Sequence, residues 1–229
     1  MTLAFRHIAV LITVLVLPAC AGLGLKQNFA PAAAVNPGVG EAWTYQVVNG
    51  YNKLPVNKQR HQVVSAAAER FETRITEEGP GPGLSRTYVP GWNPDSGVYP
   101  VGLAMAGFWN GIPPGAPVRY APPLPLFRFP LTPGKSWRET VTVSDPATGK
   151  QVPVQVVASV DGMETVTVPA GQFQAVKVSR NLYYQDAEWW RGPVFQQMTD
   201  WYAPSVNRVV RHWERSQYVD HTRRGFNDS

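Results

Sequence analysis

The chain has 229 residues, of which 44% are hydrophobic and only 16% charged, and it includes eight Trp and nine Tyr. That composition excludes a disordered chain, and the length fits one domain with short extensions. The net charge is +5, but the basic residues are scattered, with Arg223-Arg224 as the only adjacent pair. This argues against nucleic acid as a partner, because such proteins cluster their basic residues on one face.

The N-terminus has the pattern of a secretory signal. Arg6 precedes a ten-residue apolar run, Ile8 to Leu17. A spanning helix needs about 20 apolar residues, whereas the apolar region of a signal peptide has roughly 7–15. Residues 1–19 are therefore predicted to be a signal peptide.

The signal ends in Leu17-Pro18-Ala19-Cys20, which contains the only cysteine of the chain. This stretch resembles the lipobox of bacterial lipoproteins, although Pro18 departs from the commoner Ala or Ser. The resemblance implies diacylglyceryl transfer to Cys20, cleavage before it, and acylation (palmitate) of the new amine. The alternative is an ordinary signal with an incidental cysteine. Ala21, where Asp would favour inner-membrane retention, implies an outer-membrane lipoprotein facing the periplasm.

Residues 20–39 are predicted to be the lipidated cysteine and a flexible tether, because small residues, Gly and Pro follow one another without a period. A coil of this length spans about 25 Å. The domain proper is predicted over 40–215, followed by a polar, fraying tail over 216–229.

Within that domain, β-branched and aromatic residues predict strands separated by turns. The expected strands in the first third are Ala42–Asn49, Gln59–Ala66 and Arg70–Thr76, with a turn at Asn49-Gly50. Those in the last half are Trp137–Val143, Val152–Val160, Glu164–Val168, Phe173–Tyr184, Gln196–Tyr202 and Val206–Glu214. A second hairpin turn is expected at Asp161-Gly162. Short turns between successive strands predict an antiparallel meander.

The segment from Gly79 to Gly134 differs, because it holds thirteen of the 22 prolines and ten of the 20 glycines. Long strands are disfavoured there. Its eight aromatic residues nevertheless predict that it packs on the sheet, as a large insertion or lid.

Two further stretches carry a family resemblance. Residues 164–178 contain Val-Pro-Ala-Gly-Gln-Phe, and residues 201–210 read Trp-Tyr-Ala-Pro-Ser-Val-Asn-Arg-Val-Val. They resemble signatures of the TapB-like exported domains of unknown function, with Asn207 in place of the usual Gly. The resemblance implies a mainly β fold: an antiparallel, strongly curved sheet, or half-barrel, similar in shape to the lipoprotein carriers LolA and LolB. It implies no activity.

Catalytic and metal-binding patterns are weak. His212 and Glu214 are the one His/carboxylate pair that shares a strand face, but a zinc site needs three or four ligands. Asp186 with Glu188, or Asp200 with Glu214, could form a glycosidase-like pair only if the fold brought them together. The expectation is a protein that is not an enzyme, without cofactor or metal.

Aromatic residues give the sharper hypothesis. Consecutive strand residues point to opposite faces, so one of Trp189 and Trp190 is expected outside the core. The predicted ligand groove is lined by these two residues with Trp201, Tyr202 and Trp213. The predicted function is a membrane-anchored envelope lipoprotein that binds an apolar ligand, lipid or protein segment on its curved sheet. The alternatives are an interaction lipoprotein without a small ligand and, less favoured, an envelope hydrolase.

Overall fold

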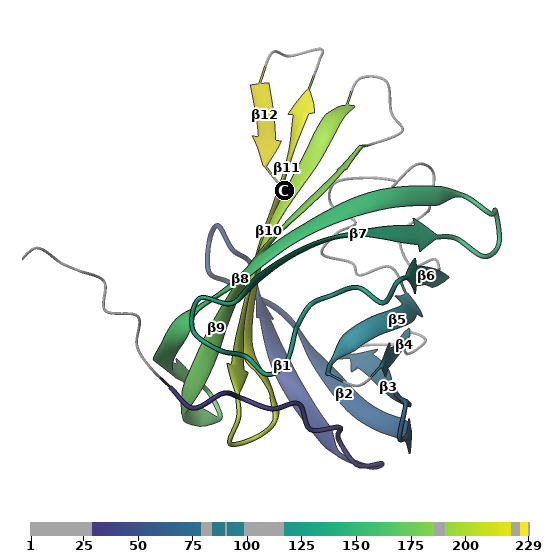
Figure 1. Cartoon of the computed structure of the whole chain (residues 1–229). Helices are drawn as coiled ribbons and strands as arrows, with labels where there is room; N and C mark the ends of the chain where they lie inside the picture. Colours follow the sequence, from purple (N-terminus) through teal and green to yellow (C-terminus); the bar gives the residue numbers. More distant parts are fainter. Residues whose placement is uncertain are drawn as a thin grey trace, which may run out of the picture.

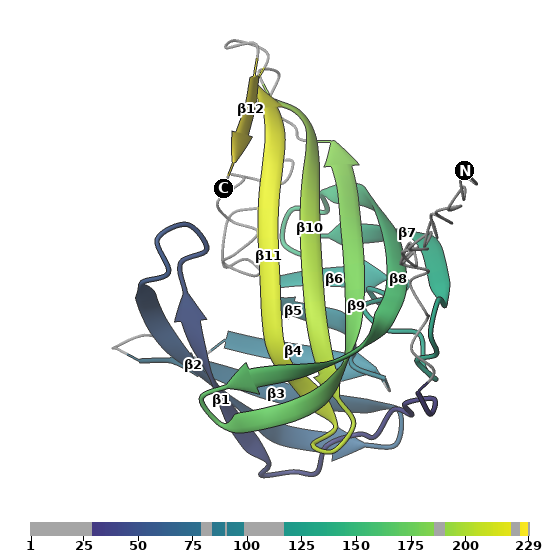
Figure 2. The same ribbon diagram turned by 90° about the vertical axis from the view of Figure 1, so that its left-hand side faces the viewer.

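The computed structural model describes residues 29–78, 84–89, 91–98, 117–185, 191–220 and 225–228. Cys20 and the signal lie outside these ranges. The described residues form one sheet of twelve strands, in which each strand pairs antiparallel with the next along the chain. Figures 1 and 2 show that the sheet curls strongly, so that the later strands cross in front of the earlier ones. The predicted meander and half-barrel are confirmed.

The strands follow the expected order along the chain. Their bounds are β1 Ala42–Val48, β2 Pro55–Ala67, β3 Arg70–Glu77, β4 Leu84–Val89, β5 Asn93–Val98, β6 Pro117–Ala121, β7 Ser136–Ser144, β8 Gln151–Val168, β9 Gly171–Gln185, β10 Arg191–Ala203, β11 Arg208–Asp220 and β12 Gly225–Asp228. β4, β5 and β6 all lie in the proline- and glycine-rich stretch. They are short, as the composition predicts, but they are strands of the sheet rather than a loop lying on it.

The curl brings the first strand of the sheet against the eleventh. The Tyr45 hydroxyl on β1 donates a hydrogen bond to the Val209 carbonyl on β11, with an O–O distance of 2.7 Å. Arg208 pairs with Glu41 at 2.6 Å and stacks on the Trp43 ring, 4.7 Å from its centroid. Side chains therefore join two strands from opposite ends of the sheet.

The concave face is packed in part by the inner segment, which we define as residues 122–134 between β6 and β7. Leu124, Phe127 and Leu131 of this segment are buried against apolar side chains of the strands. Polar contacts fix its backbone: the Asn93 amide bonds both the carbonyl and the N–H of Phe127, at 2.9 and 2.8 Å. The inner segment therefore belongs to the core.

One predicted turn is wrong. Asp161-Gly162 was expected to end a strand, but β8 runs through it to Val168, and the register with β9 shifts between Val160 and Gly162. A shift of this kind is a β-bulge, which bends a strand and increases its twist. The far end of the β8–β9 hairpin then folds across β10 and β11 (Figure 2).

Both ends of the domain extend further than predicted. Part of the expected tether contacts the body: Ala32 is buried and exchanges backbone hydrogen bonds with Leu131, at 3.1 and 2.9 Å. At the other end, β11 continues to Asp220 and pairs with β12. Residues 216–220 and 225–228 of the expected tail are thus strand residues, because cross-strand pairing accommodates polar sequence that has no apolar period.

The turn after β10 gives a stability prediction. Asn207 has a φ of 51°, a left-handed conformation that asparagine tolerates and β-branched residues do not. We expect Asn207→Val to lower the free energy of unfolding by about 1–2 kcal/mol, measured by urea denaturation, whereas Asn207→Gly should match or exceed the wild type. Equal stability of the Val and Asn forms would contradict the strained turn.

Candidate functional site

Three neighbouring strands place charged side chains side by side on the concave face. Arg180 comes from β9, Asp200 from β10 and His212 from β11, and Asp200 lies directly opposite His212 in the register. Arg180 and Asp200 form an ion pair in which the two side chains are 0% and 6% exposed. Arg180 also donates to the Leu126 carbonyl of the inner segment at 2.8 Å. A buried ion pair needs such extra hydrogen bonds, because desolvation costs several kcal/mol per ion.

The charges continue from this pair towards solvent. His212 Nδ1 lies 2.6 Å from an Asp200 carboxylate oxygen, and Nε2 lies 3.2 Å from Glu214. Gln196, which is fully buried, donates to the same Glu214 oxygen at 3.4 Å. The His212 and Glu214 side chains are 39% and 27% exposed. We call these five residues the inner polar network: its Arg180 end is buried, and its His212–Glu214 end faces water.

Electrostatics fix the protonation states. Burial alone would raise the pKa of the Asp200 carboxyl, but the Arg180 and His212 cations lower this pKa to about 2. Burial acts on His212 in the opposite direction, lowering its pKa, yet the Asp200 and Glu214 carboxylates outweigh it and raise the pKa to about 10. At neutral pH, His212 is therefore a cation held between two carboxylates.

These shifts predict an alkaline loss of stability. The folded pKa of His212 lies above its ordinary 6.5, so its contribution is complete below pH 6.5 and is lost as the pH rises towards 10. We expect the urea midpoint to fall over this range, by less than the pKa shift implies, because water screens the partly exposed ring. The fall should vanish in His212→Gln and persist in His61→Gln; an alkaline fall that His212→Gln leaves unchanged would contradict the assignment.

His61 differs from His212 although both face inward. Its ring stacks on Trp43, with 5.6 Å between centroids, and meets Tyr45 edge-on at 5.1 Å. Burial first, and the Arg86 charge second, lower the pKa of His61 to about 3. His61 is therefore neutral, with its Nε2 atom buried and without a hydrogen-bond partner. Although Lys58, Gln59 and Arg60 just before it are polar, the curl of the sheet turns His61 inward.

Charged side chains of the late strands shift the pKa values of groups on the early strands, across the interior. Arg86 on β4 contacts the Tyr88 hydroxyl at 3.4 Å. The Arg86 pKa is raised chiefly by Tyr88 and also by Glu214 on the far strand β11. On β1, burial and then the Asp200 charge raise the pKa of the Tyr45 hydroxyl. The aromatic side chains of the early strands and the inner polar network therefore share one interior.

Several buried polar atoms of this interior lack a partner. Besides His61 Nε2, they include Trp92 Nε1, Arg180 Nε and Gln196 Oε1. Leaving a buried donor or acceptor unsatisfied costs about 1–3 kcal/mol. Proteins usually satisfy such groups with other protein atoms or with water, so at each of these four atoms a water molecule or a polar ligand would be stabilised.

The network limits the chemistry available. Asp200 and Glu214, which one sequence hypothesis paired, each contact the same imidazole, and His212 lies between them as a cation. Both ring nitrogens face carboxylates, which leaves neither free to take a proton from a nucleophile. No cluster of His, Cys, Asp or Glu that could hold a metal ion occurs within the described ranges. Asp186, Glu188 and His221 fall outside those ranges.

Among the described aromatic residues predicted to line a ligand groove, Tyr202 lies apart from Trp201 and Trp213, because it faces the core and they face outward. Trp201 and Tyr202 point to opposite faces of β10. Trp201 packs under the folded-over β8–β9 hairpin and its indole N–H donates to Glu164, whereas Tyr202 is buried with Phe127 in the core. Trp213 is 37% exposed on the outer face. Trp189 and Trp190 lie outside the described residues, so their role stays a prediction.

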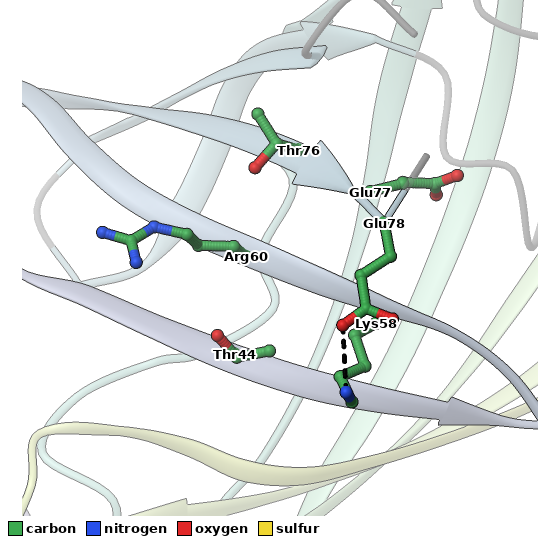
Figure 3. Close-up of a pocket in the computed structure, with 6 residues that line it drawn as sticks. All are labelled: Thr44, Lys58, Arg60, Thr76, Glu77 and Glu78. Carbon is green, nitrogen blue, oxygen red and sulfur yellow. Dashed lines mark hydrogen bonds and ion pairs between the residues drawn. The ribbon is translucent and has the colours of Figure 1, made fainter. Parts of the chain in front are cut away.

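A shallow hollow of about 260 Å³ lies on the outer face of β1 to β3 (Figure 3). Its lining is polar: Thr44, Lys58, Arg60, Thr76, Glu77 and Glu78. Lys58 and Glu78 form an exposed ion pair at 2.9 Å. Because this hollow is shallow and lined only by polar side chains, it offers a ligand no apolar wall, and we place the candidate site on the concave face.

Sequence reasoning missed Arg180 and Gln196. A signal for Arg180 exists in its strand, where it occupies the same alternating set as Val176, Val178 and Leu182, all buried. A charged residue at a core position of a strand needs a buried partner, which the sequence does not identify. That partner is Asp200 on the neighbouring strand β10, where it lies opposite Val178, two residues before Arg180. The described part of the chain contains no helix that is long and apolar enough to cross a bilayer.

Comparisons with known proteins do not identify a family for the chain. No protein-family model matches the chain, and no curated protein matches it either. Two solved structures align over most of its length. One is a Bacteroides fragilis protein described as exported, with a YmcC-like fold: 15% identity, TM-score 0.46, covering 86% of this chain and 95% of the other. The second, from Parabacteroides distasonis, is described as a lipoprotein: 15% identity, TM-score 0.44, covering 87% and 96%.

Proposed function

We propose that this chain is a lipid-anchored envelope protein whose concave sheet face binds an amphipathic ligand with an anionic head. The anchor is Cys20, and the site is the interior that the inner polar network shares with the aromatic side chains of β1 to β5. The single observation that carries the proposal is the set of four buried polar atoms without a hydrogen-bond partner in that interior: His61 Nε2, Trp92 Nε1, Arg180 Nε and Gln196 Oε1.

The chemistry of the site favours an anion. Three cations, Arg86, Arg180 and His212, face two carboxylates, Asp200 and Glu214. The partnerless atoms include the N–H donors of Trp92 and Arg180, and donors in a buried site stabilise negative charge. Because the inner segment already fills much of the apolar concave face, a purely apolar guest is the weaker choice.

Apolar contacts remain for the tail of such a ligand. Trp43 and Tyr45 are only partly buried at the junction of β1 with β11. Ligand sites typically combine apolar walls with a few placed polar groups. A junction lined by these rings, close to His212, has that composition.

Octanoate is a suitable probe, because it is a soluble anionic amphiphile. Ligand that binds only the folded state raises the thermal midpoint as its concentration exceeds the Kd. We expect octanoate to raise the midpoint of the full lipoprotein, while octanol and acetate at equal concentration do not. The response should be lost in His212→Gln and kept in Glu69→Gln, a change in an exposed turn.

Two results would count against the proposal. One is the absence of any octanoate response in the wild type. The other is an equal response in His212→Gln, which would place the anion elsewhere on the molecule. The alternative function, an interaction lipoprotein without a small ligand, would then lead.

A further inference from the structure

The turn between β1 and β2 gathers exposed apolar side chains. Val48, Tyr51, Leu54 and Val56 are 47%, 65%, 61% and 61% exposed. They lie within nine consecutive residues, which we call the hairpin tip (residues 48–56). The other large exposed apolar residues within the described ranges are Val35, Val39, Tyr183 and Trp213. A concentrated apolar projection of this kind marks a contact surface.

The backbone of the hairpin tip is satisfied from within. The Asn49 side-chain oxygen accepts hydrogen bonds from the N–H groups of Tyr51 and Asn52, at 2.9 and 3.2 Å. The Asn52 side-chain oxygen accepts from Leu54 N–H at 2.9 Å. Lys53, at a φ of 62°, turns its ammonium back onto the Gly50 carbonyl. Taking a backbone out of water is costly unless its polar groups are already paired, and here most are.

We propose that the hairpin tip inserts into the headgroup–acyl boundary of the same lipid leaflet to which the chain is anchored. The proposal rests on the anchoring proposed above. The composition fits a membrane interface: aliphatic side chains to enter the acyl boundary, Tyr51 to lie at headgroup depth, and Lys53 to meet anionic headgroups.

The short segment between Cys20 and the first described residue favours contact with this membrane. Nine residue steps separate Cys20 from Phe29, the first described residue. A fully extended chain spans at most about 3.6 Å per residue, so Phe29, where the body of the protein begins, stays within roughly 32 Å of the lipidated cysteine. Because Ala32 is fixed to Leu131, later residues do not lengthen this reach. A domain held that close meets the bilayer surface continually.

Fluorescence depth measurement tests the proposal on the lipidated full chain. Cys20 is the only cysteine and its thiol is acylated in the proposed anchor, so Tyr51→Cys supplies a single labelling position for an environment-sensitive nitrobenzoxadiazole dye. The matched control is Glu69→Cys, in the exposed turn at the other end of β2. That strand has thirteen residues, so about 40 Å separates the two turns.

Both labelled proteins are reconstituted into vesicles of phosphatidylethanolamine and phosphatidylglycerol containing nitroxide-labelled lipid. We expect blue-shifted emission and strong nitroxide quenching at position 51, and neither at position 69. Adding Leu54→Asp to the position-51 protein should abolish the quenching.

The outcomes separate this proposal from the anchor. Protein that fails to float with the vesicles would contradict the anchor itself. Protein that floats while position 51 remains unquenched would overturn the membrane contact alone. Shielding of position 51 only when envelope proteins are added would also overturn it, and would assign the hairpin tip to a protein partner.

Discussion

Replacing Asp200 by asparagine is expected to lower the free energy of unfolding by about 3–5 kcal/mol, the cost of leaving a buried charge without its partner. Arg180 is completely buried, and Asp200 is the carboxylate that compensates it. The loss would be read from urea denaturation followed by Trp fluorescence at neutral pH.

Two controls make this result specific. Asp161→Asn removes an exposed carboxylate that bonds Ser159 and Ser179, and should cost about 1 kcal/mol or less. The double change Arg180→Met with Asp200→Leu removes both charges and should recover most of the stability. Equal costs for Asp200→Asn and Asp161→Asn would show that the ion pair is not buried as described.

Phe127→Ala is the second large effect, with an expected cost of about 3–5 kcal/mol. Phe127 is 2% exposed, and its ring packs against Tyr202 and under the Arg180 guanidinium. The same denaturation measurement detects the loss.

Phe195→Ala is the matched control, because its ring pairs with the exposed Tyr183 on the outer face. It should cost about 1 kcal/mol, the scale of one aromatic pair. If Phe127→Ala were equally mild, the inner segment would be a loop resting on the sheet rather than part of its core.

The strands were predictable because their residues alternate on the concave and outer faces. From Val152 to Val156, every second residue is fully buried, and that period is visible in the sequence. The bulge at Asp161-Gly162 was not predictable, because a two-residue polar break has the same composition in a tight turn and in a bulge. Only the pairing of β8 with β9 on both sides of the break distinguishes the two.

The proline-rich stretch was predicted to be an insertion or lid that packs on the sheet, whereas its described residues include three strands of the sheet. Its proline content does keep β4 to β6 short, but each still pairs with both neighbours. Local composition sets the length of a strand, while its place in a sheet depends on pairing with distant residues. For the same reason, Ala32 looked like part of a free tether, although Leu131, ninety-nine positions later, holds it.

The candidate site was the least predictable part. His212 with Glu214, and Asp200 with Glu214, could be named as pairs from the sequence. Their arrangement around a single protonated ring depends on the register of β10 with β11, and the partnership with Arg180 depends on that of β9 with β10. Trp201 and Tyr202 do not line one groove, because adjacent residues of a strand face opposite sides of the sheet.

Both proposals depend on the chain being a lipoprotein, so the decisive measurement is the intact mass of the protein isolated from bacterial membranes. We expect a mature chain beginning at Cys20 whose mass exceeds that of residues 20–229 by a diacylglyceryl group and one N-linked acyl chain, with Cys20→Ser losing both additions. A mature chain with an unmodified Cys20, or one cut elsewhere, would contradict the anchor.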